Sequence, residues 1–578
     1  MMNSLLGRYL RPHRLVLVLI AFLLLIQVIT NLYLPNLNAD IINQGVITGD
    51  IGYILRAGGL MLLISLLLGI SSVIAVYFSA RTAMRLGRDI RGDLFRRVES
   101  LSLSQVNALG VPSLITRNTN DVQQIQMLVM TGLTMMILAP ITAIGAVIMA
   151  IRENAQLSLL LIVIIPLMLA VISIMVFKAI PLFKVMQVKI DRVNQVLREN
   201  LTGIRVVRAF NRTPIEEVRF AEANADLTGT TLKVTRIFAL VLPMLLLIMN
   251  LSSVAVLWFG GHLVAEGSMP IGNLTAFLAY IMQILFSVMM AVMTLMMVPR
   301  AAASADRINE VLDTVPDIVD MPHRDILDGE RVGHVVLRDV SFRYPGAEEA
   351  ILQGIDIDFP PGTTTAIIGG TGSGKTTVVN LIPRLLDVTS GSVEVAGRDV
   401  RDIPQEELWQ SFGLVPQRAF LFSGTIASNL RFGSPEASED QMWEALRIAQ
   451  AEDFVRALPD QLESPVDQGG ANFSGGQRQR LAIARALVRR PPIYVFDDSF
   501  SALDYATDAR LRRALHDSTQ GATVIIVAQR VASITTADQI LVMDEGHIVG
   551  RGTHRELLDT CETYREIVDS QAEAAEAS

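Results

Sequence analysis

The chain has 578 residues, of which 51% are hydrophobic and only 18% are charged, and its formal net charge at neutral pH is −8. This charged fraction lies below the roughly 25% usual for soluble proteins, which excludes an ordinary soluble enzyme, and the acidic balance argues against a nucleic-acid partner. The single cysteine, Cys561, excludes an internal disulfide, and the histidines lack the spacing of a zinc site.

Apolar runs of about 20 residues, the length that crosses a bilayer core about 30 Å thick, fill the first half of the chain. They predict six transmembrane helices, over 15–34, 54–78, 127–151, 157–177, 237–260 and 274–298. Arginines precede the first run, as they would in a signal peptide. Because no small-residue cleavage site follows that run, we expect a retained span.

The connections between these runs differ in charge. The two longest, 79–126 and 178–236, are rich in arginine and lysine, whereas 35–53 and 261–270 contain neither. The positive-inside rule therefore places the long connections and both termini in the cytoplasm. Apolar residues recur at helical spacing within the long connections, which predicts helices that continue past the membrane and turn near Ser113 and Thr213. Solvated basic loops are the alternative.

The apolar spans contain some amide side chains and many methionines. A buried amide is costly in lipid unless it is paired, so such residues either line a cavity or form hydrogen bonds between helices. The amides are Gln27, Asn31, Asn250 and Gln283. Methionines in the third and sixth spans either contact varied apolar substrates or simply pack the helices. Examples are Met127, Met130, Met289 and Met290.

Beyond residue 340, short β-branched strands alternate with glycine turns and helices, which predicts a soluble α/β domain. A strand over 364–368 precedes a glycine-rich loop that opens a helix over 377–386, and this is the context of a phosphate-binding P-loop. Backbone N–H groups would wrap the phosphates of ATP, Lys375 would supply a positive charge, and the Thr376 hydroxyl would bind Mg²⁺. The residues expected to contact nucleotide here are Gly369, Gly370, Thr371, Gly372, Ser373, Gly374, Lys375, Thr376 and Thr377.

A second strand, over 493–496, ends in two aspartates. Carboxylates at the C-terminal edge of such a sheet lie where phosphate and magnesium bind. We expect Asp497 to hold the metal through water and Asp498 to orient the attacking water. The alternative, an aspartate pair that caps the next turn, is common in isolation but fits poorly beside a P-loop.

The segment Phe-Ser-Gly-Gly-Gln at 473–477 opens a strongly helical stretch over 478–488. At this point the sequence resembles the ATP-binding cassette (ABC) family, whose signature motif has this form. With six spans ahead of the cassette, the chain looks like a half-transporter of the exporter-type (type IV) class. The fold that this implies is an all-α six-helix transmembrane domain fused to an α/β P-loop nucleotide-binding domain. The family motifs carry over onto Tyr344 as the aromatic that stacks on adenine, Gln417 as a metal contact that also takes part in the reaction, and Ser474, Gly475, Gly476, Gln477 and Asp504 as further nucleotide contacts.

In that family two cassettes dimerise head to tail, so each ATP lies between the P-loop of one chain and the signature motif of the other. The resemblance therefore implies a second half-transporter as partner, ATP and Mg²⁺ as cofactors, and the lipid bilayer as environment. It also implies a small lipid, drug or other amphipathic substrate and a multi-pass location in a bacterial cytoplasmic membrane, with the cassette in the cytoplasm.

Two positions depart from the family pattern. Asp498 stands where the family has a catalytic glutamate, and Gln529 stands where it has a switch histidine. Asp498, Gln529, Gln417 and Lys375 are thus the candidate catalytic residues, in a site that we expect to bind ATP but to hydrolyse it slowly. This is typical of the degenerate-site subunit of a heterodimeric exporter. The alternatives are a homodimeric exporter, an importer with the same fold, an ATP-gated channel or regulatory subunit, and a soluble chromosome- or repair-type ATPase, which the six spans exclude.

These patterns predict four parts of the chain. Residues 1–300 form the transmembrane domain with its cytoplasmic helix extensions, and 301–333 form a connecting helix and linker. Residues 334–570 form the cassette. The remaining residues, 571–578, are interpreted as a frayed helical tail.

Overall fold

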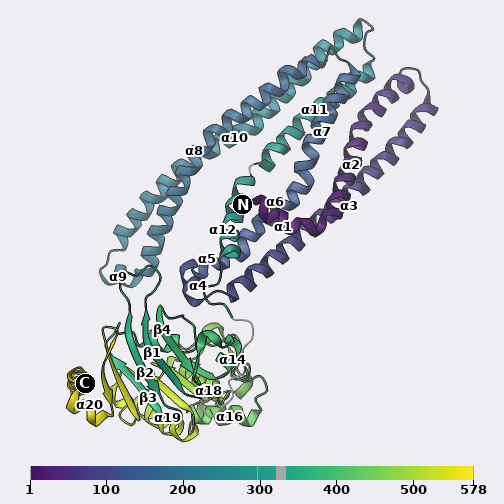
Figure 1. Ribbon diagram of the computed structural model, residues 1–578. Coiled ribbons are helices and arrows are strands. Elements are labelled where there is room, and N and C mark those ends of the chain that lie inside the picture. The colour runs from purple at the N-terminus through teal and green to yellow at the C-terminus, as the bar shows by residue number, and fades with distance from the viewer. Residues whose placement is uncertain (1, 296, 321–332, 577–578) are drawn as a thin grey trace. The chain divides into compact units, whose positions relative to one another are not determined.

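The computed structural model describes residues 2–295, 297–320 and 333–576 (Figure 1). The chain forms two compact units. The first, called here the helical unit, comprises Met1–Glu99 and Pro112–Thr314, and the second, the cassette unit, comprises Ser100–Val111 and Val315–Ser578. The expected connecting segment thus divides at residue 314, because its helical part packs with the helical unit.

Within the described residues, six helical stretches are long and apolar enough to cross a membrane, which confirms the six predicted spans. Each has 43 to 53 residues, more than twice the length that a bilayer core requires, so the helices do continue beyond it. They run over Ser4–Val46, Ile51–Glu99, Val111–Glu153, Leu159–Thr202, Thr213–Ala265 and Ile271–Asp313. The first stretch extends past the expected edge at residue 34, and the connection expected over 35–53 is therefore mostly helical.

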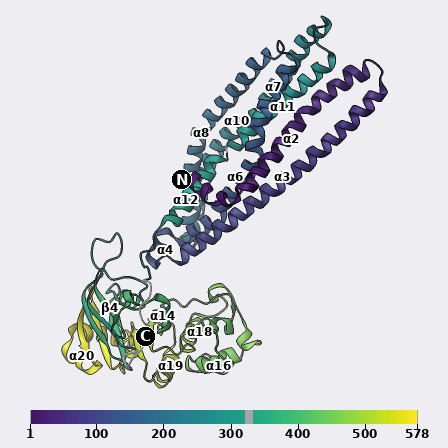
Figure 2. The same ribbon diagram turned by 45° about the vertical axis from the view of Figure 1, so that its right-hand side comes forward.

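Several of these stretches are built from shorter elements. The α-helices of the helical unit are α1 (Met2–Leu10), α2 (Arg14–Asp40), α3 (Ile51–Glu99), α5 (Val111–Thr116), α6 (Val122–Thr131), α7 (Ile137–Glu153), α8 (Leu159–Thr202), α9 (Ile204–Ala209), α10 (Thr213–Ala265), α11 (Ile271–Leu295) and α12 (Val298–Asp313). Three π-helical segments, Ile41–Val46, Arg117–Asp121 and Gly132–Met136, join or continue them. Figures 1 and 2 show α8 alongside α10 and α2 alongside α3, and α7 packs on α11.

A buried polar cluster holds α12 against the π-helical segment Arg117–Asp121. The Asp121 side chain is 4% exposed and accepts a hydrogen bond from Nε of Arg307 at 2.7 Å. Arg117, 9% exposed, pairs with Glu310 at 2.8 Å. A buried charge is stable only when it is paired, so these contacts fix α12 on its neighbour.

The cassette unit contains two main sheets. The strands are β1 (Val335–Phe342), β2 (Leu352–Phe359), β3 (Thr364–Gly369), β4 (Ser390–Val395), β5 (Arg398–Asp399), β6 (Phe412–Val415), β7 (Gly424–Thr425), β8 (Pro465–Val466), β9 (Ile493–Asp497), β10 (Thr523–Val527), β11 (Gln539–Asp544) and β12 (His547–Gly552). One sheet has the order β2-β1-β4-β5 and is antiparallel. The other has the order β12-β11-β3-β10-β9-β6 and is parallel except for β12, and β7 pairs with β8.

The parallel sheet has a hydrophobic core on each face, which explains why its central strands are almost entirely apolar. Successive residues of β10 alternate between two hydrophobic cores: Ile525 belongs to one and Ile526 to the other. The helices of this unit are α4 (Leu103–Leu109), α13 (Lys375–Leu381), α14 (Gln405–Gln410), α15 (Ile426–Arg431), α16 (Glu439–Ile448), α17 (Glu452–Arg456), α18 (Gly475–Leu487), α19 (Tyr505–Ser518), α20 (His554–Thr560) and α21 (Glu562–Glu576).

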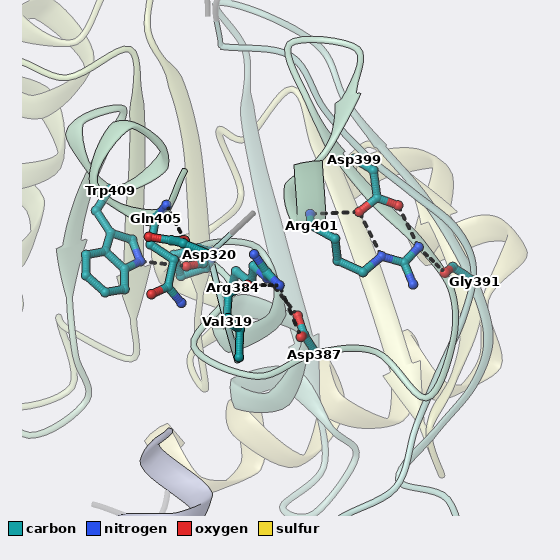
Figure 3. Close-up of polar contacts among 10 residues, drawn as sticks. Val319, Asp320, Arg384, Asp387, Gly391, Asp399, Arg401, Gln405 and Trp409 are labelled. Atoms are coloured by element: carbon teal, nitrogen blue, oxygen red, sulfur yellow. Dashed lines mark hydrogen bonds and ion pairs between the residues drawn. The ribbon is translucent and has the colours of Figure 1, made fainter. Parts of the chain in front are cut away.

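The segment that follows α12 is bound to the cassette unit. The backbone N–H of Gln405 donates to the Asp320 carboxylate at 2.9 Å, and the Arg384 guanidinium donates to the Val319 carbonyl at 3.5 Å (Figure 3). Arg384 is itself buried and pairs with Asp387 at 3.0 Å. Residues 315–320 are therefore part of the cassette unit, and the rest of the expected linker up to 332 lies outside the described residues.

Candidate nucleotide site

The glycine-rich loop joins β3 to α13 as the sequence predicts. Gly374 has φ +97°, and a Cβ there would lie 2.6 Å from the Leu352 side chain, so only glycine fits. The Lys375 ammonium lies across the loop and donates to the carbonyls of Gly369 at 2.9 Å and Gly370 at 2.6 Å. The loop thus holds its own cation where the chain turns into the helix.

The predicted helix over 377–386 is wrong at both ends. It begins at Lys375 and ends at Leu381. Pro383 explains the early end, because proline lacks the N–H that the helix would need in order to continue. Arg384 then adopts a positive φ of 54°, which completes the turn.

Two acidic residues at the end of β9 face the loop. The Thr376 hydroxyl donates to Oδ1 of Asp497 at 3.2 Å. Oδ2 of Asp498 accepts from Nε2 of Gln529 at 2.7 Å and from Nε2 of Gln417 at 3.3 Å. The structure therefore brings together these five residues, which the sequence predicted from separate motifs.

Burial shifts the pKa values of the two carboxyls and of the lysine ammonium in this site. Loss of hydration raises the pKa of the Asp497 and Asp498 carboxyls above the usual aspartate value, although hydrogen bonds from Thr376 and Gln417 oppose the rise. Burial also lowers the pKa of the Lys375 ammonium, against the attraction of both carboxylates. The site is thus desolvated, and its charges favour a ligand that brings compensating charge.

These residues line a cavity of about 500 Å³. From the predicted set its walls include Gly369, Gly370, Thr371, Gly372, Lys375, Thr376, Gln417, Asp497, Asp498 and Gln529. The remaining wall includes Glu566, Ile567, Ser570 and Gln571 of α21, which the sequence analysis missed. No local motif marks them, because their place depends on how the last helix folds back onto the sheet.

The donor set fits magnesium. Among the described residues no three His, Cys, Asp or Glu side chains cluster as a complete metal site. Mg²⁺ is usually held by one or two carboxylates together with water and substrate phosphates, so a hydroxyl, a carboxylate and an amide suit it. Thr376, Asp497 and Gln417 are the residues that would hold it.

The remaining predicted nucleotide contacts lie elsewhere in the cassette unit. Tyr344 is hydrogen-bonded through its hydroxyl to Thr377 at 3.3 Å, which places it beside the loop helix. Ser474 caps α18 in a capping box with Gln477, and Asp504 caps α19. In the described part of the chain, none of the residues Ser474, Gly475, Gly476, Gln477 and Asp504 lines the P-loop cavity.

Comparisons with known proteins agree with this architecture. Residues 17–288 match the family described as "ABC transporter transmembrane region", and 352–501 match that described as "ABC transporter". The chain is 47% identical to an uncharacterized ABC transporter ATP-binding protein of Mycobacterium tuberculosis, over 100% of this chain and 99% of that protein. It is 32% identical to an ATP-dependent lipid A-core flippase of Syntrophus aciditrophicus, over 86% of this chain and 82% of that one.

A solved structure shares the fold. A bacterial Atm1-family ABC exporter with ATP bound superposes with a TM-score of 0.79 at 23% identity, covering 97% of this chain and 98% of that one. At this identity the likeness concerns the fold alone. The six-helix unit followed by an α/β nucleotide-binding unit is thus the exporter-type arrangement, as predicted.

Proposed function

Because this chain belongs to the ABC transporter family, we propose that it is the degenerate-site half of a heterodimeric exporter, which binds Mg-ATP at its own P-loop but hydrolyses it slowly. The observation that carries this proposal is the hydrogen bond of 2.7 Å between Gln529 and Asp498. It joins the two positions at which the sequence departs from the family, directly beside the P-loop.

The first reason for slow hydrolysis is reach. The aspartate side chain is one methylene, roughly 1.5 Å, shorter than glutamate, and a displacement of about 1 Å at a reacting group can lower the rate about 100-fold. Asp498 Oδ2 also receives two amide donors, from Gln417 and Gln529. Hydrogen bonds to a carboxylate stabilise its charged form, so they oppose the rise in pKa that burial causes and limit the strength of Asp498 as a base.

The second reason is charge. Histidine at position 529 could become cationic as negative charge develops on a transferring phosphoryl group, whereas a glutamine amide stays neutral. Gln529 can donate a hydrogen bond to a terminal phosphate. It therefore supports binding more than turnover.

The binding elements are complete. A phosphate group would compete with the loop carbonyls for Lys375, and bound Mg²⁺ would supply a counter-charge to the phosphates beside Thr376, Asp497 and Gln417. The N-terminus of α13 adds the favourable end of a helix dipole. ATP retention with little hydrolysis follows from this combination.

The proposed partner is a second half-transporter. The signature residues of this chain lie apart from its own P-loop cavity, so the Ser474 cap and the start of α18 would complete a nucleotide site on another chain. Such a partner would carry glutamate and histidine at the two departing positions. The pair would lie in the cytoplasmic membrane, with both cassettes in the cytoplasm. A homodimer is the main alternative.

The proposed substrate is a lipid, drug or other amphipathic molecule. A cavity of about 450 Å³ in the helical unit is lined mainly by apolar side chains, four of them methionines: Met168, Met249, Met282 and Met289. Gln283 also lines it, donates through Nε2 to the Asn31 carbonyl at 3.4 Å, and has a buried Oε1 atom without a hydrogen-bond partner among the described residues. An apolar wall with one amide side chain suits an amphipathic ligand.

The proposal is tested with the full chain in lipid nanodiscs, alone and co-purified with a half-transporter from a neighbouring gene. We expect the chain alone to bind Mg-ATP with little turnover, and the pair to hydrolyse it and to be stimulated by lipids or amphipathic drugs. Turnover by the chain alone near 10 s⁻¹, a median enzyme rate, would contradict the degenerate site. ATP-dependent single-channel currents without vectorial transport would contradict export.

Gln283 sharpens the substrate test. In the Q283L variant, which makes this wall apolar, stimulation of the pair by amphiphiles should fall several-fold, while stimulation by purely apolar analogues persists. Q27L is the matched control, because Gln27 is also a span glutamine but does not line this cavity. Equal effects of both variants would contradict the role of the Gln283 amide.

A further inference from the structure

The last helix of the chain forms one wall of the nucleotide cavity. Glu566, Ile567, Ser570 and Gln571 all line it, and their spacing of one, four and five residues places them on a single face of α21. From the sequence, Gln571 is predicted to lie in a frayed tail. In the structure its side chain is tied to the centre of the site.

The Gln571 side-chain amide uses both of its polar atoms on one stretch of backbone. Nε2 donates to the carbonyl of Gln529 at 2.7 Å, and Oε1 accepts from the N–H of Val531 at 2.8 Å. These two bonds hold the main chain on both sides of Arg530. This is the segment that leaves β10 and carries the switch-position glutamine.

Beyond that backbone, the Gln529 side chain donates to Asp498 at 2.7 Å. A side chain with three rotatable bonds finds one partner reliably only when its own backbone is fixed. Gln571, Gln529 and Asp498 therefore form a continuous chain of hydrogen bonds from α21 to the end of β9.

We propose that Gln571 is a positioning residue for the nucleotide site. It acts through Gln529: by fixing the backbone of that residue, it holds the Gln529 amide where it meets Asp498 and a bound terminal phosphate. This inference rests on the proposed function, because it requires that the P-loop cavity binds Mg-ATP. It adds to the nucleotide site a residue that lies outside the P-loop, the signature motif and the strand-end aspartates.

A double-mutant cycle separates positioning from a purely structural role. Mg-ATP affinity is measured by displacement of a fluorescent ATP analogue from the full chain in lipid nanodiscs, for the wild type, Q571M, Q529A and Q529A/Q571M. Methionine is close to glutamine in size and keeps the packing of α21 while removing both hydrogen bonds. We expect Q571M to weaken affinity about five- to tenfold, and to have no further effect once Gln529 is alanine.

The control variant is D569A. Asp569 is an exposed residue of the same helix and does not line the cavity, so this variant should bind Mg-ATP as the wild type does. Thermal unfolding of each variant reports any loss of folding. Unchanged affinity in Q571M, or an equal loss in both backgrounds of the cycle, would overturn the positioning role. Absence of Mg-ATP binding by the folded wild type would instead overturn the proposed function, and this inference with it.

Discussion

The P-loop region and the signature region of the same cassette differ in how many of their polar side chains find partners on other elements of the chain. Around the P-loop, Lys375, Thr376, Asp497 and Asp498 are all bound to neighbours from other elements of the unit. Around the signature, the side chains of Ser474 and Gln477 each accept from the other's backbone N–H, and the described residues show no side-chain partner from another element for either of them. A Cβ at Gly475 would meet nothing within 4 Å. The first region is a pocket, and the second is an exposed helix start, which on the proposed function binds the nucleotide of another chain.

The largest expected effect lies in the pocket. Replacing Lys375 by alanine removes the ammonium that the loop carbonyls hold, and no second cation among the residues lining the cavity replaces it. We expect the affinity for Mg-ATP to fall by about 100-fold or more, since a charge-assisted contact to phosphate is lost. Nucleotide displacement in nanodiscs measures this. A loss below about threefold would show that the pocket does not bind ATP through its P-loop.

The next largest effect lies in the signature region. There a substitution should spare the chain's own Mg-ATP affinity and lower the turnover of the complex. The S474A variant should leave the chain's own Mg-ATP affinity within about twofold. It should lower the turnover of the complex with its partner by about tenfold or more, because a helix cap and a phosphate donor are both lost at the partner's site. ATPase activity with and without the partner decides this. If S474A weakened binding to the isolated chain, the two regions would not be separate half-sites.

Restoring the family residues should raise hydrolysis at the chain's own site. The double variant D498E/Q529H extends the carboxylate toward the water and allows a cationic switch residue, so turnover at this site should rise by about tenfold. The measurement is single-turnover hydrolysis in complexes whose partner P-loop lysine is replaced. No increase would mean that other residues limit hydrolysis.

The smallest effect is expected from D498N. Turnover of the complex should change by less than about twofold, because on the proposed function the competent site contains the partner's P-loop. Burial raises the pKa of the Asp498 carboxyl in the folded chain above its unfolded value near 3.9, so the stabilising contribution of this group is present below that pH and is lost as the pH rises. At neutral pH the nucleotide-free D498N variant should therefore melt at a higher temperature than the wild type, with the difference shrinking toward pH 4. A lower melting temperature at neutral pH would contradict this sign.

Local pattern alone determined much of this protein. Runs of apolar residues predict the six spans because lipid admits only helices that satisfy their own backbone, and the glycine loop before Lys375 predicts the P-loop because only glycine permits its turns. Pro383 also marks the end of α13 in the sequence, although the predicted helix extended past it to residue 386.

Only the tertiary structure decided how separate motifs meet. The hydrogen bond between Gln529 and Asp498 joins residues 31 positions apart, and Gln571 reaches Gln529 across a further 42. Motifs in the sequence mark Asp498 and Gln529, but no motif marks Gln571. Parallel strands bring their carboxyl ends to one edge of a sheet, and the last helix packs against that edge, so these contacts exist only once the whole cassette has folded.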